Sequence, residues 1–301
     1  MPCYHPLTAG RSKLPDLSTG KHRICFHPKY PQQYTEIQLP CGRCRGCRHE
    51  HARQWAVRIC HEAQLYNGNN SFITLTFDDK KHRYTNTLKK SDFQLFMKRL
   101  RKHYYGNLKS DLRYFHCGEY GENFGRPHHH AILFNHTFPD QTLWDEKSGN
   151  KYYRSKTLEK LWPQGHSVIG SVNYQTAAYV ARYVIKKING KLAPDHYQGR
   201  LPEYTTMSRR PGIAREWYEK YKNTDVFPRD YIALNGVKQK VPKYYSKCYE
   251  LTNPEQYGIL RNMRIAKAKL NPNNHPDRLK AAEQIQFARD TQLKRPYENH
   301  P

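Results

Sequence analysis

The chain has 301 residues, and its 51 Lys and Arg side chains against 26 Asp and Glu give a formal net charge of +25. A charge of this size excludes an ordinary neutral metabolic enzyme and predicts a polyanionic partner, because each neutralised phosphate releases counterions. Nucleic acid is favoured over an anionic membrane surface, since no amphipathic membrane helix is evident. Hydrophobic residues make up 37% and aromatic residues 13% of the chain, which predicts a lean, aromatic-rich core and excludes a wholly disordered protein.

No apolar run approaches the roughly 18 to 20 residues that a membrane span requires. The sequence begins Met1-Pro2-Cys3-Tyr4-His5, without the apolar block of a signal peptide. It therefore predicts a protein that has no membrane partner and is made and used in a cytoplasm.

Segments with strand and helix patterns alternate along the chain. Strand patterns occur at residues 71–77, 112–120, 127–135 and 168–172. Helical spacing occurs at residues 48–66, 173–188, 254–270 and 277–293. A further helix is predicted to begin after an N-cap at Ser91. The order predicts an α+β fold with an antiparallel β-sheet flanked by helices.

At about 150 residues per domain, the length indicates two domains. In more detail, we expect a cysteine-rich N-terminal segment and helix at residues 1–66 and a catalytic domain at residues 67–192. A basic, partly helical C-terminal extension is expected at residues 193–301.

Three of the eight cysteines, Cys41, Cys44 and Cys47, recur at a spacing of three residues. Without an export signal, such clustering favours a shared metal ion over disulfides, and a structural Zn²⁺ is the favoured interpretation. Tetrahedral zinc needs a fourth ligand, for which Cys3, Cys25, His49 and His51 are all candidates. Cys3 is the one assigned to the site with the three spaced cysteines. Reduced thiols in a basic loop and an iron–sulfur centre are the alternatives.

The strand predicted at residues 127–135 carries three consecutive histidines. Alternation places His128 and His130 on one face and His129 on the other. If residues 121–126 form a hairpin loop, Glu119 on the preceding strand lies opposite the outer pair. Two neutral imidazoles and one carboxylate form a three-ligand metal site with open positions, which is typical of catalytic sites. Solvent-facing histidines after a turn are the alternative.

The helix predicted at residues 173–188 presents two phenols and an ammonium on its polar face, those of Tyr179, Tyr183 and Lys186. A phenol with a pKa of about 10 is a poor nucleophile until its anion is stabilised. A lysine or a metal-polarised phosphate supplies that help, so the pattern favours phosphodiester cleavage. Ordinary packing of the two tyrosines is the alternative.

Taken in order, three segments resemble the motifs of HUH endonucleases that initiate rolling-circle replication. They are Thr74-Leu75-Thr76-Phe77, then Arg126 to Phe134, then Tyr179 to Lys187. The segments Cys41 to Cys47 and Met207 to Ile213 resemble the initiators of microviruses, especially the gokushovirus branch, so the similarity spans roughly residues 1–220. One departure is His129, which stands where the family usually has a hydrophobic residue.

The resemblance implies a role for each matching residue. Metal ligands are expected at Glu119, His128 and His130, paired nucleophiles at Tyr179 and Tyr183, the motif lysine at Lys186 or Lys187, and DNA contacts at Arg126, Arg182, Arg209 and Arg210. One tyrosine would become joined to the 5′ phosphate of the nicked origin strand, and the second would cut the regenerated origin so that the displaced strand is rejoined into a circle.

The same resemblance implies Mg²⁺ or Mn²⁺ as the catalytic ion and the host cytoplasm as the place of action. The implied partners are single-stranded and origin DNA and the host polymerase and helicase.

Two other functions compete with this one. A related HUH transposase would more often carry a single tyrosine, and a non-catalytic basic zinc-containing DNA-binding protein would need none. A zinc hydrolase is disfavoured because no His-Glu-x-x-His motif occurs.

Overall fold

The computed structural model describes residues 3–18, 20, 22–78, 86–106, 108, 110–121, 125–147, 149–186 and 193–292, without the side chains of residues 183–186. The chain divides into two compact units. The first comprises Met1–His51 and Gly258–Pro296, and the second comprises Ala52–Tyr257 and Tyr297–Pro301.

The first unit contains a small antiparallel sheet of order β2-β1-β3, formed by β1 (Leu7–Ser12), β2 (Ile24–Cys25) and β3 (Tyr34–Leu39). It also contains the start of α1 (Arg45–Gln64), most of α8 (Pro254–Lys269) and α9 (Pro276–Gln292). Asp290 on α9 accepts hydrogen bonds from Arg45 Nη1 at 3.0 Å and His49 Nε2 at 3.1 Å, which ties α9 to the start of α1.

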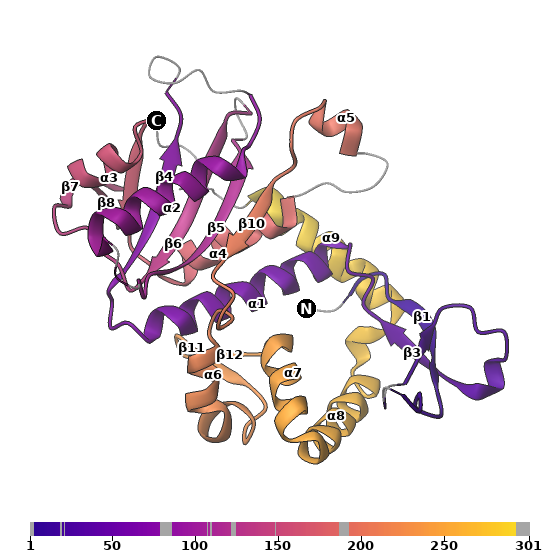
Figure 1. Cartoon of the computed structure of the whole chain (residues 1–301). Helices are drawn as coiled ribbons and strands as arrows, with labels where there is room; N and C mark the ends of the chain where they lie inside the picture. Colours follow the sequence, from indigo (N-terminus) through magenta and orange to yellow (C-terminus); the bar gives the residue numbers. More distant parts are fainter. Residues whose placement is uncertain are drawn as a thin grey trace. The chain divides into compact units, whose positions relative to one another are not determined.

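The second unit is built on a seven-stranded antiparallel sheet of order β10-β5-β6-β4-β9-β8-β7 (Figure 1). Its strands are β4 (Asn70–Thr76), β5 (Arg113–Tyr120), β6 (Pro127–Phe134), β7 (Thr142–Lys147), β8 (Asn150–Arg154), β9 (Ser167–Gly170) and β10 (Tyr204–Met207). The helices of this unit, besides the rest of α1, are α2 (Lys90–Tyr105), α3 (Lys156–Leu161), α4 (Tyr174–Lys186), α5 (Ala193–Tyr197), α6 (Arg215–Tyr221) and α7 (Lys243–Thr252). A short hairpin joins β11 (Ile232–Leu234) and β12 (Val237–Gln239).

Each face of the large sheet has its own apolar core, because alternate side chains of the central strands point to opposite sides. On one face, Phe72, Phe115 and Ile132 pack with side chains of α1, α4, α6 and α7. On the other, Ile73 and Leu133 pack with side chains of α2 and α3. The sheet is therefore the middle layer of three, which confirms the predicted α+β class.

The predicted elements match the structure within a few residues, with two corrections. Ser91 is not an N-cap: α2 begins at Lys90 and its N-cap is Lys89, which makes no side-chain capping bond. A hydrogen bond from the Leu88 N–H to Tyr120 Oη, 3.1 Å long, holds the chain just before the helix. The cysteine-rich segment, which shows no periodicity, nevertheless forms the three-stranded sheet. No helix within the described part of the chain is long and apolar enough to cross a bilayer.

Candidate active site

The pairing of three central strands places the candidate metal ligands side by side. On β6, His128 lies between Glu119 of β5 and Thr76 of β4. His130 lies two residues further along the same face, opposite Thr74 of β4. The hairpin register expected from the sequence is thus present, and the outer two histidines share a face with Glu119.

The three side chains converge closely enough to hold one cation. Glu119 Oε1 lies 2.7 Å from His130 Nε2 and 3.3 Å from His128 Nε2, and one ligand atom from each residue lies within 4.8 Å of the others. Only 1% of the Glu119 and His130 side chains is exposed, against 16% of the His128 side chain, so the cluster reaches solvent beside His128. A carboxylate and two imidazoles suit a divalent ion bound at about 2.0 to 2.2 Å from each ligand.

The electrostatics of the cluster favour a negative carboxylate. Burial alone would raise the pKa of Glu119, but hydrogen bonds and charge interactions with His128 and His130 outweigh it and lower the pKa to about 2. At neutral pH the site therefore presents a buried anion beside two imidazoles, which is the charge arrangement that attracts a cation.

The middle histidine belongs to the opposite face of the sheet. His129 is fully buried, its Nδ1 lies 3.1 Å from Nε2 of His116, and it packs against the ring edges of Phe77 and Trp162. Burial lowers the pKa of His129 to about 3, so this imidazole is neutral within an aromatic core.

The helix α4 brings Tyr179 to the cluster. Tyr179 Oη lies 3.4 Å from His130 Nε2, and the two rings meet edge to face with their centroids 5.1 Å apart. Only 1% of Tyr179 is exposed. The phenol oxygen is thus beside the imidazole nitrogen that faces Glu119.

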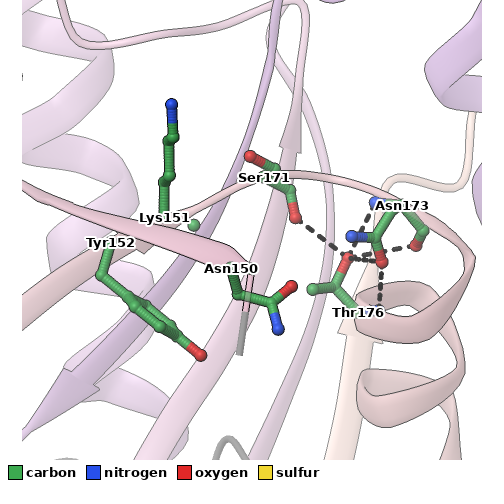
Figure 2. Close-up of a pocket in the computed structure, with 8 residues that line it drawn as sticks. Asn150, Lys151, Tyr152, Ser171, Asn173 and Thr176 are labelled. Atoms are coloured by element: carbon green, nitrogen blue, oxygen red, sulfur yellow. Dashed lines mark hydrogen bonds between the residues drawn. The ribbon is translucent and has the colours of Figure 1, made fainter. Parts of the chain in front are cut away.

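The start of α4 is fixed by a reciprocal capping arrangement, which Figure 2 shows. The Thr176 N–H donates to Asn173 Oδ1 and the Asn173 N–H donates to Thr176 Oγ1, each at 2.9 Å. Next to this cap lies a cavity of about 180 Å³, lined in part by Asn150, Tyr152 and Ser171. Buried Ala177, Val180 and Ala181 anchor the apolar side of the helix.

The other residues predicted on α4 are only partly described. Tyr183 and Lys186 belong to the helix, but their side chains lie outside the described residues, and Lys187 lies outside them altogether. Their roles as second nucleophile and motif lysine remain predictions.

Two of the predicted DNA-contacting arginines lie on or directly before elements of the site. Arg126 is exposed just before β6, and the guanidinium of Arg182 lies 5.7 Å from the centroid of the Tyr179 ring. The other two, Arg209 and Arg210, are exposed on the segment between β10 and α6. Hydrogen bonds to buried or half-buried side chains hold the backbone of that segment: Arg113 Nη2 to Pro211 O at 2.8 Å, Arg58 Nη2 to Ile213 O at 2.9 Å, and Ala214 N–H to Glu62 Oε2 at 2.5 Å.

A second candidate metal site lies in the first unit. The sulfur atoms of Cys3, Cys41, Cys44 and Cys47 all lie within 4.8 Å of one another, so Cys3 joins the three spaced cysteines. Backbone N–H groups donate to three of these sulfur atoms, from Cys41 to Cys3 Sγ, from Cys44 to Cys41 Sγ and from Tyr4 to Cys44 Sγ. The pKa shifts within the group differ in direction. Burial raises the pKa of Cys3 and of Cys47, whereas at Cys41 the N–H groups of Cys44 and Arg43 outweigh burial and lower the pKa to about 7, which favours a thiolate at that position.

Sequence reasoning missed the residues that fix the end of β4. Trp162 Nε1 donates to the carbonyl of Thr76 at 2.8 Å, and the Thr76 N–H donates to His166 O at 2.9 Å. A Cβ at Gly165 would lie 2.1 Å from the Thr76 carbonyl oxygen, so only glycine allows this close approach. In the sequence, the run Trp162-Pro163-Gln164-Gly165-His166 was the signal that could have pointed to these residues.

Comparison with known proteins identifies the family. Residues 70–188 match the family model described as Replication-associated protein ORF2/G2P. The chain is 34% identical over 264 residues to the Replication-associated protein VP4 of Bdellovibrio phage phiMH2K, covering 85% of this chain and 80% of that protein. The chain belongs to the replication-associated protein ORF2/G2P family.

Two further phage replication-associated proteins are similar to the chain. The chain is 29% identical to the Replication-associated protein ORF2 of Spiroplasma virus 4, with 83% of this chain and 81% of that protein covered. It is also 29% identical to the Replication-associated protein ORF4 of Chlamydia phage 1, with 69% and 52% covered. No solved structure matches the chain significantly. The family match runs from β4 through α4 and so includes Glu119, His128, His130 and Tyr179.

Proposed function

We propose that this protein nicks and rejoins DNA during phage rolling-circle replication, with Tyr179 and Tyr183 as nucleophiles. The observation that carries the proposal is the 3.4 Å separation between Tyr179 Oη and His130 Nε2, which puts a phenol beside the Glu119, His128 and His130 cluster. The replication-associated proteins of the phage relatives support the same role.

A Mg²⁺ or Mn²⁺ ion bound by the cluster would polarise the non-bridging oxygens of the scissile phosphate. The residues of the chain do the rest. Glu119 and the two histidines fix where the phosphate binds, and Tyr179 attacks it. The bond between the tyrosine oxygen and phosphorus forms, the bond to the 3′ oxygen breaks, the phenol loses its proton, and the 3′ oxygen gains one.

The resulting 5′-phosphotyrosine ester keeps the energy of the broken bond, so rejoining consumes no nucleotide. Tyr183 lies one helical turn from Tyr179 and would make the second cut after a round of synthesis. The released 3′ hydroxyl would then attack the first ester and close the displaced strand into a circle. Having two nucleophiles allows both steps without dissociation from the origin.

The charge of +25 fits a protein that binds single-stranded and origin DNA. We assign phosphate contacts to Arg126, Arg182, Arg209 and Arg210. The host polymerase and helicase would extend and unwind the nicked strand in the host cytoplasm. The four clustered cysteines would hold a structural Zn²⁺.

The test is incubation of single-stranded origin DNA with the full chain and Mg²⁺ or Mn²⁺, followed by detection of covalent protein–DNA adducts. Tyr179→Phe and Tyr183→Phe should each retain some adduct, and the double variant should form none. DNA binding without any adduct from the unaltered protein would instead support a non-catalytic zinc-containing DNA-binding protein.

A further inference from the structure

Thr74 contacts the side of His130 that faces away from Glu119. Strand pairing sets Thr74 of β4 directly opposite His130, and Thr74 Oγ1 lies 3.0 Å from His130 Nδ1. The other ring nitrogen, Nε2, lies 2.7 Å from Glu119 Oε1 and 3.4 Å from Tyr179 Oη. One imidazole thus links a hydroxyl on β4 to both the candidate metal cluster and the candidate nucleophile.

We infer that Thr74 is a positioning residue that sets the tautomer and orientation of His130 for metal binding, an inference that rests on the proposed function. A histidine that ligates a cation through Nε2 must carry its proton on Nδ1, and that N–H needs an acceptor. Thr74 Oγ1 is the acceptor in place. Because His130 is 1% exposed, water has little access to replace it.

A hydroxyl suits this position because it can both donate and accept. Without a cation, Nε2–H can donate to Glu119 while Thr74 donates to Nδ1. With a cation on Nε2, the proton moves to Nδ1 and Thr74 accepts. A carbonyl or carboxylate could serve only the second arrangement. Thr74 therefore allows the ring to change tautomer on loading without rotating.

Two aromatic rings hold the plane of His130, whereas Glu119 Oε1 and Tyr179 Oη contact Nε2 and not Nδ1. Phe72 stacks on the ring at a centroid distance of 5.9 Å with 8° between the planes, and Tyr179 meets it edge to face. These ring contacts would survive the loss of the Thr74 hydroxyl. The tautomer preference would not.

The experiment compares Mn²⁺ binding by the full chain and three variants, with free Mn²⁺ followed by electron paramagnetic resonance. Thr74→Val keeps the shape and removes the hydroxyl, and Thr74→Ser keeps the hydroxyl. Thr142→Val is the matched control, because Thr142 is exposed on the edge strand β7 and its Oγ1 donates to Arg154 O at 3.5 Å, not to a candidate ligand.

We expect Thr74→Val to weaken Mn²⁺ binding by about 10- to 100-fold, the usual effect of losing such an outer partner. Thr74→Ser and Thr142→Val should stay within about threefold of the unaltered protein. Unchanged affinity in Thr74→Val, or equal losses in Thr74→Val and Thr74→Ser, would overturn the inference while leaving the proposed function standing. Failure of the unaltered protein to bind Mn²⁺ would overturn both.

Discussion

Glu119 Oε1 lies 2.7 Å from His130 Nε2, and each of these side chains is only 1% exposed. A buried carboxylate is costly unless it is paired, so this contact both stabilises the sheet and fixes the direction from which a cation is held. Because His128 is the more exposed ligand, a phosphate would approach the cluster from the His128 side.

Replacing Glu119 with Gln tests the charge of the cluster. Glu119→Gln keeps the size of the side chain but removes the anion that a divalent cation requires. We expect Mn²⁺ affinity and adduct formation to fall together by more than about 100-fold, beyond the range typical of outer-shell changes. Titration with Mn²⁺ and an adduct assay measure this. Glu146→Gln, at an exposed position of β7, should change neither, and full Mn²⁺ affinity in Glu119→Gln would disprove the ligand assignment.

Buried histidines should make the fold sensitive to mild acid. Burial lowers the pKa of His61 to about 3 and that of His136 to about 4, from an ordinary value of 6.5. Below pH 6.5 the unfolded chain therefore binds protons that the folded chain does not. These two groups therefore leave the free energy of unfolding at its full value above pH 6.5. As the pH falls from 6.5 towards 4, each group lowers the free energy of unfolding by about 1.4 kcal/mol per pH unit.

Urea unfolding between about pH 7 and pH 5 measures the slope of the unfolding free energy against pH. The variant His61→Phe removes the contribution of one histidine to that slope. The His61 ring stacks on Trp217 with centroids 3.4 Å apart, a contact that Phe preserves. We expect the slope to decrease by about one proton in His61→Phe and to stay unchanged in Gln94→Phe, which places Phe at an exposed position of α2 without removing a titratable group. Equal slopes in all three proteins would show that His61 does not titrate in this way.

The candidate metal site was predictable where it depends on local patterns. Period-two alternation separates His128 and His130 from His129, and the short loop after Tyr120 sets Glu119 opposite them. The partner of His130 on its other side was not predictable, because the register between β4 and β6 depends on strands far apart in the sequence. Likewise, helical spacing gives the face that carries Tyr179 but not which strand that face meets.

The fold shows the same limit. Strands of the sheet interior have clear alternation, whereas β7 is an edge strand in which most residues are exposed, so its sequence carries no apolar pattern. The assignment of Cys3 to the cysteine cluster agrees with the structure, but no sequence pattern excluded Cys25, His49 or His51, because the segment before α1 has no periodicity. Only the tertiary fold of this segment brings Cys3 to Cys44, with sulfur atoms 3.8 Å apart.

Zinc content distinguishes the four clustered cysteines from the rest. Cys3→Ser removes one thiolate of the group, so we expect it to lose bound zinc and the first unit to unfold at lower urea concentration. Cys25→Ser is the control, because Cys25 is equally half-buried but lies outside the group. Metal analysis of the purified proteins and urea unfolding followed by circular dichroism provide the measurements. Stoichiometric zinc in Cys3→Ser would show that Cys3 is not a ligand.

Gly121 leaves room for the ring of His128. A Cβ at this position would lie 2.9 Å from His128 Cε1, well inside the usual carbon–carbon contact distance of about 3.5 to 4.0 Å. Gly121→Ala should therefore turn the ring and carry Nε2 away from Glu119 Oε1, 3.3 Å distant. We expect Mn²⁺ affinity to fall by about 10-fold or more.

The backbone of Gly121 does not have a positive φ, so the substitution should leave the free energy of unfolding within about 1 kcal/mol of the original. Loss of affinity at constant stability separates displacement of a ligand from general damage to the fold. Gly258→Ala, where a Cβ meets nothing within 4 Å, should alter neither Mn²⁺ binding nor adduct formation. Full affinity in Gly121→Ala would mean that the orientation of His128 is not set by this contact, and that the exposed side of the cluster can adjust to its ligand.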